Sequence, residues 1–333
     1  ANTTASSNTA VGHQAGYSNT TGAVVVALGY QALYSNQTGN GNTAIGASAL
    51  YSTTSGNAST AVGYQAGYAN TTGTEQTFVG YIAGKNTTTG NYNTAVGAGS
   101  LQSNTTASYN TAVGYRAAYA NTTGAGTIAV GGLALHKNTT GNSNNAFGYA
   151  ALSENTTGNY NSAFGQQALY NNTTASNNTA VGYQAGYSNT TGTKLTSIGR
   201  VSGYSNTTGG SNIYVGDSAG YNHQGSRAIA IGQYAGGCYQ HQYSIAIGVN
   251  AGALCQGYPG CCVYHVGSIA IGNHAGYCLQ GQCSVAIGNY AGYCQHQNSI
   301  IFNATGSALN SGGSCRFYVA PIRNASGSKG LFY

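Results

Sequence analysis

The sequence TAVGHQAGYSNTTG at residues 9–22 returns almost unchanged at residues 60–73 and at residues 179–192. The starting positions differ by 51 and 119 residues, which are three and seven times 17. A repeat of fixed period indicates similar structural units, each stacked on its neighbour. One position of this repeat is always glycine: Gly12, Gly29, Gly46, Gly63, Gly80, Gly97, Gly114, Gly131, Gly148, Gly165, Gly182, Gly199 and Gly216.

Toward the C-terminus the period shortens to 16 residues, with glycines at Gly232 and Gly248 and, after an insertion, at Gly272 and Gly288. We therefore predict an all-β chain, a parallel β-solenoid of about 17 coils. At about 4.8 Å per coil this predicts a rod of roughly 80 Å. The expected regions are a 17-residue-repeat solenoid at 1–222, a cysteine-rich 16-residue-repeat solenoid at 223–298 with an insertion at 253–267, and a capping or docking tail at 299–333.

Each repeat has a fixed pattern around its glycine. The preceding residue is always apolar, as in Val62, and the residue two positions before that one is mostly Thr, as in Thr60. Side chains alternate along a strand, so these two columns share one face. We expect them to face a column of small residues, such as Ala66, across a thin interior. The intervening position is mostly Ala, as in Ala61, and can be buried in the coil or form a second contact surface between neighbouring chains, which we favour.

Composition points away from most globular classes. Only 4% of the 333 residues are charged, whereas about a quarter is usual, so hydroxyls, amides or attached sugar must keep the surface hydrated. The net charge of +6 comes from scattered cations without a basic stripe, which is weak evidence for nucleic-acid binding. No apolar run is long enough to span a bilayer. The chain contains no Met, so we expect a processed product or a fragment.

The turn of many repeats reads Asn-Thr-Thr-Gly, which matches the N-glycosylation motif. Tight turns also select Asn and Gly, so the motif can arise from the turn alone. Because sequons vanish where the cysteines concentrate and the surface lacks charge, we favour glycosylation. The candidate residues are Asn2, Asn19, Asn36, Asn70, Asn104, Asn121, Asn138, Asn155, Asn172, Asn189, Asn206, Asn303 and Asn324; sequons also stand at Asn57, Asn86, Asn171 and Asn177.

All eight cysteines lie in the C-terminal third, which favours disulfides and an oxidising compartment. Eight cysteines allow 105 pairings, so the sequence cannot assign them. Three fall six residues after their glycine, which predicts bonds between neighbouring coils rather than a metal site. The disulfide candidates are Cys238, Cys255, Cys261, Cys262, Cys278, Cys283, Cys294 and Cys315.

Nothing in the sequence favours catalysis. The three carboxylates, Glu75, Glu154 and Asp217, are far apart in the repeat order, so no acid–base pair can be proposed. We predict no enzyme activity, no catalytic residues, no cofactor and no metal. Tyrosines recur in columns such as Tyr17 and Tyr34, where we expect stacking along the outside; a stripe that binds sugar or a partner is the alternative.

Two motifs resemble known families. The sequences SIAIG at 244–248 and 268–272 and SVAIG at 284–288 are similar to the repeats of trimeric autotransporter adhesin heads. The sequences NTAVGYQAGY at 178–187, SIIFNATG at 299–306 and FYVAPIRN at 317–324 resemble tail-fibre-like proteins of phages and giant viruses. The first resemblance implies a left-handed β-roll and a homotrimer, and the second a self-cleaving chaperone domain after such a stretch. The chain departs from both in its cysteines, its 17-residue coil and the lack of that domain.

The sequence thus predicts a structural subunit of a glycosylated fibre or filament, extracellular or on a virion surface. Its expected partner is itself, as a homotrimer or an end-to-end filament, with no membrane span and no nucleic acid. The alternative is an adhesin or receptor-binding spike for a cell-surface glycan or receptor, with the cysteine-rich insertion as its binding tip.

Overall fold

The computed structural model describes residues 4–222, 225–254 and 267–321. Within these ranges it contains nineteen strands and no helix, and it confirms an all-β parallel solenoid. The chain divides into two compact units, Ala1–Thr208 and Gly209–Tyr333. The predicted boundary between the two repeat lengths, 222/223, therefore falls inside the second unit.

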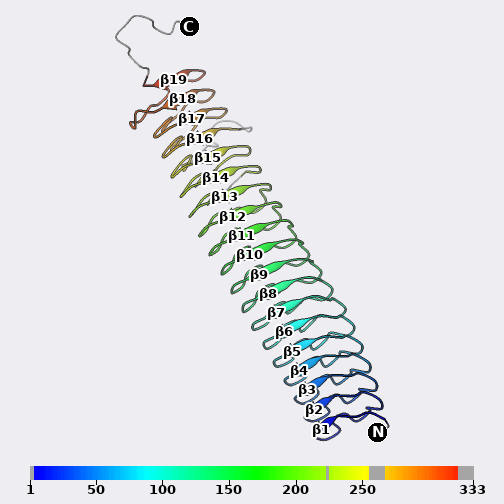
Figure 1. Ribbon diagram of the computed structural model, residues 1–333. Coiled ribbons are helices and arrows are strands. Elements are labelled where there is room, and N and C mark those ends of the chain that lie inside the picture. The colour runs from blue at the N-terminus through cyan, green and yellow to red at the C-terminus, as the bar shows by residue number, and fades with distance from the viewer. Residues whose placement is uncertain (1–3, 223–224, 255–266, 322–333) are drawn as a thin grey trace, which may run out of the picture. The chain divides into compact units, whose positions relative to one another are not determined.

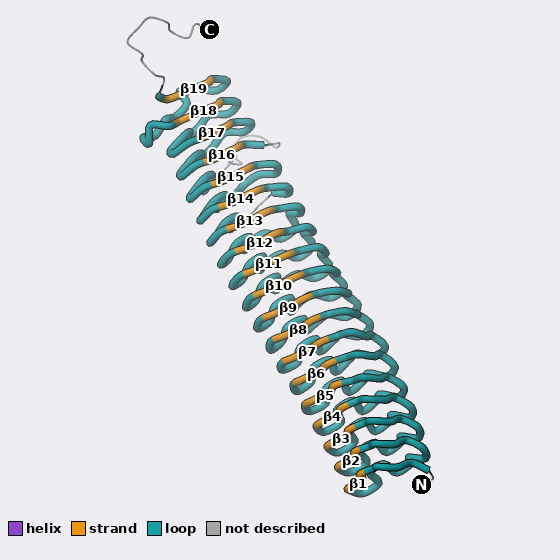
Figure 2. Tube along the Cα trace, viewed as in Figure 1, coloured by secondary structure: helices purple, strands orange, loops and turns teal. Residues whose placement is uncertain are grey.

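Each coil carries one short strand, and the remainder of the coil is loop (Figure 1, Figure 2). The strands of the first unit are β1 (Thr9–Val11), β2 (Val26–Leu28), β3 (Thr43–Ile45), β4 (Thr60–Val62), β5 (Thr77–Val79), β6 (Thr94–Val96), β7 (Thr111–Val113), β8 (Ile128–Val130), β9 (Asn145–Phe147), β10 (Ser162–Phe164), β11 (Thr179–Val181) and β12 (Thr196–Ile198). Those of the second are β13 (Ile213–Val215), β14 (Ile229–Ile231), β15 (Ile245–Ile247), β16 (Ile269–Ile271), β17 (Val285–Ile287), β18 (Ile300–Asn303) and β19 (Phe317–Ala320).

Strands pair in parallel with the same repeat position opposite itself in the next coil. In the first unit Thr43 lies opposite Thr60, a step of 17 residues. In the second unit Ile229 lies opposite Ile245, a step of 16. The insertion between β15 and β16 keeps the register, with Ile245 opposite Ile269; most of its predicted range, 253–267, lies outside the described residues. The predicted tail at 299–333 begins as two further strands, β18 and β19.

The glycine that defines the period makes the corner after each strand. At Gly114 φ is +133°, a region that L-residues rarely adopt. A Cβ on Gly114 would lie 2.7 Å from the carbonyl carbon and oxygen of Gly131 in the next coil. The same approach of backbone to backbone occurs from coil to coil, so both the dihedral angle and the space at this position require glycine.

The interior is narrower than the sequence suggested, and this reverses the predicted faces of the strand. In β4 the middle residue, Ala61, is fully buried, whereas Thr60 and Val62 are half-buried. Ala61 therefore points inward, and the column containing Val62 points outward. The prediction that the aliphatic column lines the interior was wrong, as was the favoured placement of Ala61 on a contact surface between chains. The inward strand position accepts a methyl group because the opposite wall of the coil carries Ala66 and Leu50 close by.

Two large side chains in the alanine column confirm how little room there is. Phe78 is fully buried, and a Cβ on Gly67 or on Gly84 would collide with its ring. Tyr214 is likewise fully buried, and Gly220 provides the corresponding space. Burial raises the pKa of Tyr214 well above its ordinary value, against a smaller opposing effect of the Asn212 side chain. Aromatic rings thus enter the column where glycine replaces a larger residue on the facing wall.

Polar ladders run through the first unit beside this apolar column. Asn138 is fully buried, and its Nδ2 donates to Asn121 Oδ1 (2.7 Å) and to the carbonyl of Gly141 (2.9 Å). Asn155 in the next coil repeats the pattern by donating to Asn138 Oδ1 at 2.8 Å. We call this column the asparagine ladder. Its members are Asn19, Asn36, Asn70, Asn104, Asn121, Asn138, Asn155, Asn172, Asn189 and Asn206.

The second unit replaces the asparagine ladder with glutamines. Gln240 is fully buried, and its Nε2 donates to the carbonyls of Ile229 (2.8 Å) and Ser244 (3.0 Å) within its own coil. Gln295 makes the equivalent bonds to Val285 (3.0 Å) and Ser299 (2.8 Å). Both units therefore satisfy buried backbone carbonyls with amide side chains, through different geometries.

Candidate functional site

The outward face of the strands is the most distinctive surface of the first unit. It is formed by the Thr and aliphatic columns of the strands and by the tyrosines that follow the corner glycines. We call these three columns the outer ladder. In one coil they are Thr60, Val62 and Tyr64, and the next coil contributes Thr77, Val79 and Tyr81.

The apolar members of the outer ladder are open to solvent. About two fifths of the side-chain surface is exposed for Ile45 (38%), Val181 (39%) and Ile198 (40%). Phe147 and Phe164 stack in the same column with ring centroids 4.9 Å apart, and Tyr64 and Tyr81 stack at 5.6 Å. Isolated apolar side chains on a surface need no explanation, but a continuous stripe is typical of an interaction site.

The size of this stripe is that of a protein interface. Twelve strands give eleven steps of about 4.8 Å, or about 53 Å along the unit, and four residues of strand give a width of about 13 Å. The product is about 700 Å², close to the roughly 800 Å² per partner that stable interfaces bury. The outer ladder of the first unit can therefore support a specific contact.

The asparagine ladder contradicts the predicted glycosylation. A glycan must replace a hydrogen on Nδ2, but in Asn138 this nitrogen is buried and donates two hydrogen bonds. Asn303 is also buried, and its Nδ2 donates to the carbonyls of Asn289 and Ser307. None of these asparagines can carry a sugar in this fold, so those predictions were wrong. Asn2 and Asn324 lie outside the described residues.

Three other sequons remain accessible. Asn57, Asn86 and Asn177 are exposed, and Asn171 is half-buried. The Asn57 side chain uses its Oδ1 to accept from the amide of Asn40 at 2.8 Å, which leaves its Nδ2 on the surface. These positions interrupt the regular repeat and lie outside the asparagine ladder.

If the native protein carries N-glycans, we expect them on Asn57, Asn86 or Asn177 and none on the asparagine ladder. Glycopeptide mass spectrometry of protein from its natural source tests this. The peptide from Asn138 to Lys194 contains four ladder residues together with Asn171 and Asn177, so site-resolved fragmentation is required. Sugar on Asn138 or Asn155 of folded material would contradict the buried ladder.

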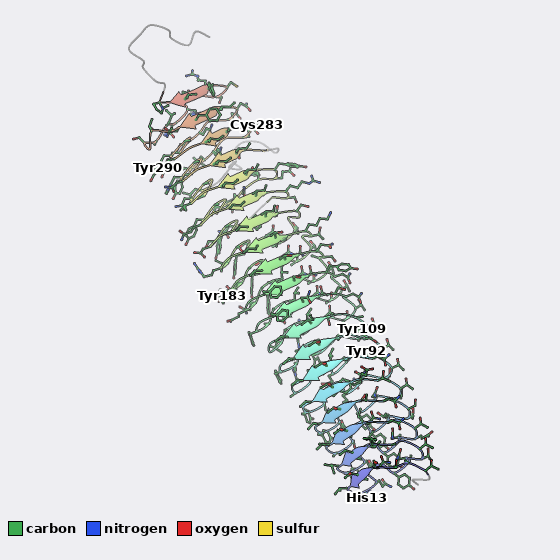
Figure 3. All side chains as sticks on the ribbon, viewed as in Figure 1. His13, Tyr92, Tyr109, Tyr183, Cys283 and Tyr290 are labelled. Atoms are coloured by element: carbon green, nitrogen blue, oxygen red, sulfur yellow. The ribbon has the colours of Figure 1, made fainter. Side chains whose placement is uncertain are left out.

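The tyrosine columns stack as the sequence predicted. Tyr17, Tyr34, Tyr51 and Tyr68 form one continuous stack with centroids 5.1–5.2 Å apart and nearly parallel rings. Because each ring face is covered by the next ring, the stack presents edges and hydroxyls to solvent. Figure 3 shows Tyr183 and Tyr92 on opposite edges of the coils, so tyrosines follow more than one column.

The described cysteines occupy two columns of the second unit and are present as thiols. Cys278 and Cys294 lie opposite each other in neighbouring coils. Cys238 does not adjoin Cys278 as a simple column would predict, because Leu254 lies between them in the intervening coil. Burial, followed by the hydrogen bond with Cys278 and its charge, raises the pKa of the Cys294 thiol. Cys255, Cys261, Cys262 and most of the proposed binding tip lie outside the described residues.

Ionisable groups do not converge on a reactive centre in the described ranges. Glu154 forms a 2.6 Å ion pair with Lys137 one coil earlier, on the surface. No group of three or more His, Cys, Asp or Glu that could hold a metal occurs there. The search of the same residues for a helix able to cross a membrane also found none.

These observations define a β-solenoid repeat protein with an exposed apolar face. No known protein-family model matches the chain, and no curated protein is similar to it in sequence. Its function is therefore argued from the repeat and the surface alone.

Proposed function

We propose that the protein is a structural subunit of an extracellular or virion-surface fibre, assembled from copies of itself. The observation that carries the proposal is the outer ladder, which exposes aliphatic and aromatic side chains from every coil of the first unit. A second copy offers the same repeat spacing, so ridges and gaps along the two faces can match over the full length.

The interior supports a load-bearing role. In each coil the hydrogen bonds run to the next coil through the strand, through the opposite segment and through the asparagine ladder. Leu50 N, for example, donates to Ala66 O at 3.0 Å on the side away from the strand. Since all three sets of bonds run between neighbouring coils, stretching the solenoid must break them together. Such a structure suits a rigid fibre better than a catalytic scaffold, which needs a concave site with convergent polar groups.

The proposed location is consistent with the chemistry of the chain. Clustered cysteines favour an oxidising environment, and the surface is hydrated by hydroxyls and amides in place of charge. Tyrosines of the outer ladder, such as Tyr64, combine a flat apolar ring with a polar hydroxyl, a combination enriched at protein interfaces.

Charging the outer ladder is expected to abolish self-association without unfolding the chain. The variant Val62→Lys, Val96→Lys, Val113→Lys places three ammonium groups in an interface where each would lose its hydration. We expect the wild-type chain to sediment as an oligomer and the variant as a monomer in analytical ultracentrifugation. Electron micrographs of native material should show uniform filaments.

The chain offers a matched control in the same three coils. Thr72, Thr106 and Thr123 are exposed in a different column, so their substitution by lysine adds the same charge elsewhere. This control should associate like the wild type, and both variants should retain the β-sheet circular dichroism spectrum. Equal association of the two lysine variants would exclude the outer ladder as the interface.

A further inference from the structure

Two cysteines of the second unit are brought together by the register of the coils. Cys278 follows Gly272 by six residues, and Cys294 follows Gly288 by six. Their backbones form a parallel bridge, and the amide of Cys278 donates to the carbonyl of Tyr293 at 2.7 Å. Neighbouring strands lie about 4.8 Å apart, within the 4.4–6.8 Å between Cα atoms that a disulfide spans.

The side chains face each other as well. The two thiols hydrogen-bond to one another, so the sulfur atoms are already neighbours. Cys294 is exposed and Cys278 is half-buried, so a small oxidant can reach the pair from solvent. An accessible pair of this kind differs from a buried structural cysteine, which is inert.

The other described cysteines lack this arrangement. Cys238 has Asn222 in the coil on one side and Leu254 in the coil on the other. Cys283 and Cys315 share a different corner of the coil, where both have positive φ, and Asn298 occupies that corner in the coil between them. Cys278 with Cys294 is therefore the one pair of adjacent cysteines among residues 4–222, 225–254 and 267–321.

We propose that Cys278 and Cys294 form a disulfide that staples two neighbouring coils of the second unit when the protein meets an oxidising thiol–disulfide couple. With glutathione disulfide as oxidant, one protein thiolate attacks its S–S bond and releases one glutathione. The second protein thiolate then attacks the mixed disulfide and releases the other glutathione. Two protein thiols are oxidised to one disulfide, and one glutathione disulfide is reduced to two glutathiones.

The bond would close a local loop of fifteen residues, 279–293. A loop of this length is associated with stabilisation near 3 kcal/mol, so opening of this coil should become roughly a hundred-fold rarer. The effect is local, because each coil contacts only its neighbours in a solenoid. The assignment does not depend on the proposed fibre function and can be tested on the isolated chain.

The test is incubation of the full chain with glutathione disulfide, alkylation of remaining thiols and chymotryptic mapping without reduction. Trypsin is unsuitable, since residues 228–315 contain neither Lys nor Arg, whereas cleavage after Tyr277, Tyr290 and Tyr293 separates the two cysteines. Cys283 shares the peptide 278–290, so the experiment uses a Cys283→Ser chain. We expect a linked peptide joining 278–290 to the peptide that begins at Cys294.

Hydrogen exchange supplies a second readout. On oxidation the amides of this coil, such as Gly281, which donates to Gln295 O at 2.8 Å, should exchange about a hundred-fold more slowly. A Cys278→Ser chain should lose both the link and the slowing, and Cys238→Ser should keep both. Linkage of Cys278 to a different cysteine, or alkylation of both thiols after oxidation, would overturn the proposal.

Discussion

A Gly114→Ala chain is expected to lose at least about 3 kcal/mol of stability in the first unit. The added methyl group would collide with the backbone carbonyl of Gly131 at 2.7 Å, and φ of +133° is strained for alanine. Since the colliding atom belongs to the next coil's backbone, it cannot move without shifting that coil and its own neighbour. Thermal unfolding followed by circular dichroism measures the loss.

Gly126 provides the matched control one turn of the pattern away. Its φ is +64°, and a Cβ there would meet nothing closer than Ser143 Oγ at 3.8 Å. Tyr109, Ser143 and Tyr160 adopt the same conformation at this corner in nearby coils. Gly126→Ala should therefore cost about 1 kcal/mol or less. Equal losses for the two variants would contradict a special role of the period-defining glycine.

The second large effect is expected from Asn138→Asp in the asparagine ladder. A carboxylate cannot donate, so Asn121 Oδ1 and the carbonyl of Gly141 would lose their donor and face a buried negative charge. At neutral pH we expect a loss of about 3–5 kcal/mol. Protonation restores one donor, so the folded-state pKa of this Asp should lie above its unfolded value of about 3.9. Stability should consequently be retained below that pH and fall as the pH rises.

Asn138→Thr is the natural comparison, because Thr53 and Thr87 already occupy this column. Their hydroxyls accept from Asn70 at 3.5 Å and from Asn104 at 3.3 Å, so the ladder tolerates them. Chemical denaturation at pH 4 and pH 7 should show a small, pH-independent loss for Thr and a pH-dependent one for Asp. The ladder would have no energetic role if Asp were no worse than Thr at pH 7.

The repeat alone was sufficient to predict the fold, and the structure explains why. Gly114 must be glycine for two independent reasons, so its recurrence is a physical requirement of the corner and not a statistical preference. Any chain that stacks coils through this corner must repeat the residue at the length of the coil. The period in the sequence is thus a direct reading of the coil.

The orientation of the strand was not readable in the same way. Ala61 and Val62 are both apolar, so alternation indicates two faces without saying which is inside. The decision depends on the thickness of the interior, which is set by the facing wall. A sequence signal existed in Phe78 and Gly84, where a large residue in the alanine column coincides with glycine on the opposite wall.

The asparagine motif was ambiguous because its chemistry serves two purposes. The amide that an oligosaccharide would modify is the same amide that satisfies the turn carbonyl and the next coil. Strict recurrence, as in Asn121, Asn138 and Asn155, was the clue to an internal role, since a ladder needs every coil and a glycan does not. The cysteine pair needed the register across the insertion, which the spacing of Cys238 did not reveal.

The buried amides also act as a measure of coil length. In the first unit the Asn138 side chain reaches a carbonyl three residues ahead, and the coil takes 17 residues. In the second unit the Gln240 side chain is one methylene longer, reaches across its own coil to Ile229, and the coil takes 16. A longer side chain inside thus accompanies a shorter main chain outside. Exchanging Asn for Gln, with one residue deleted per coil, is therefore a rule by which the circumference of such a solenoid can be set.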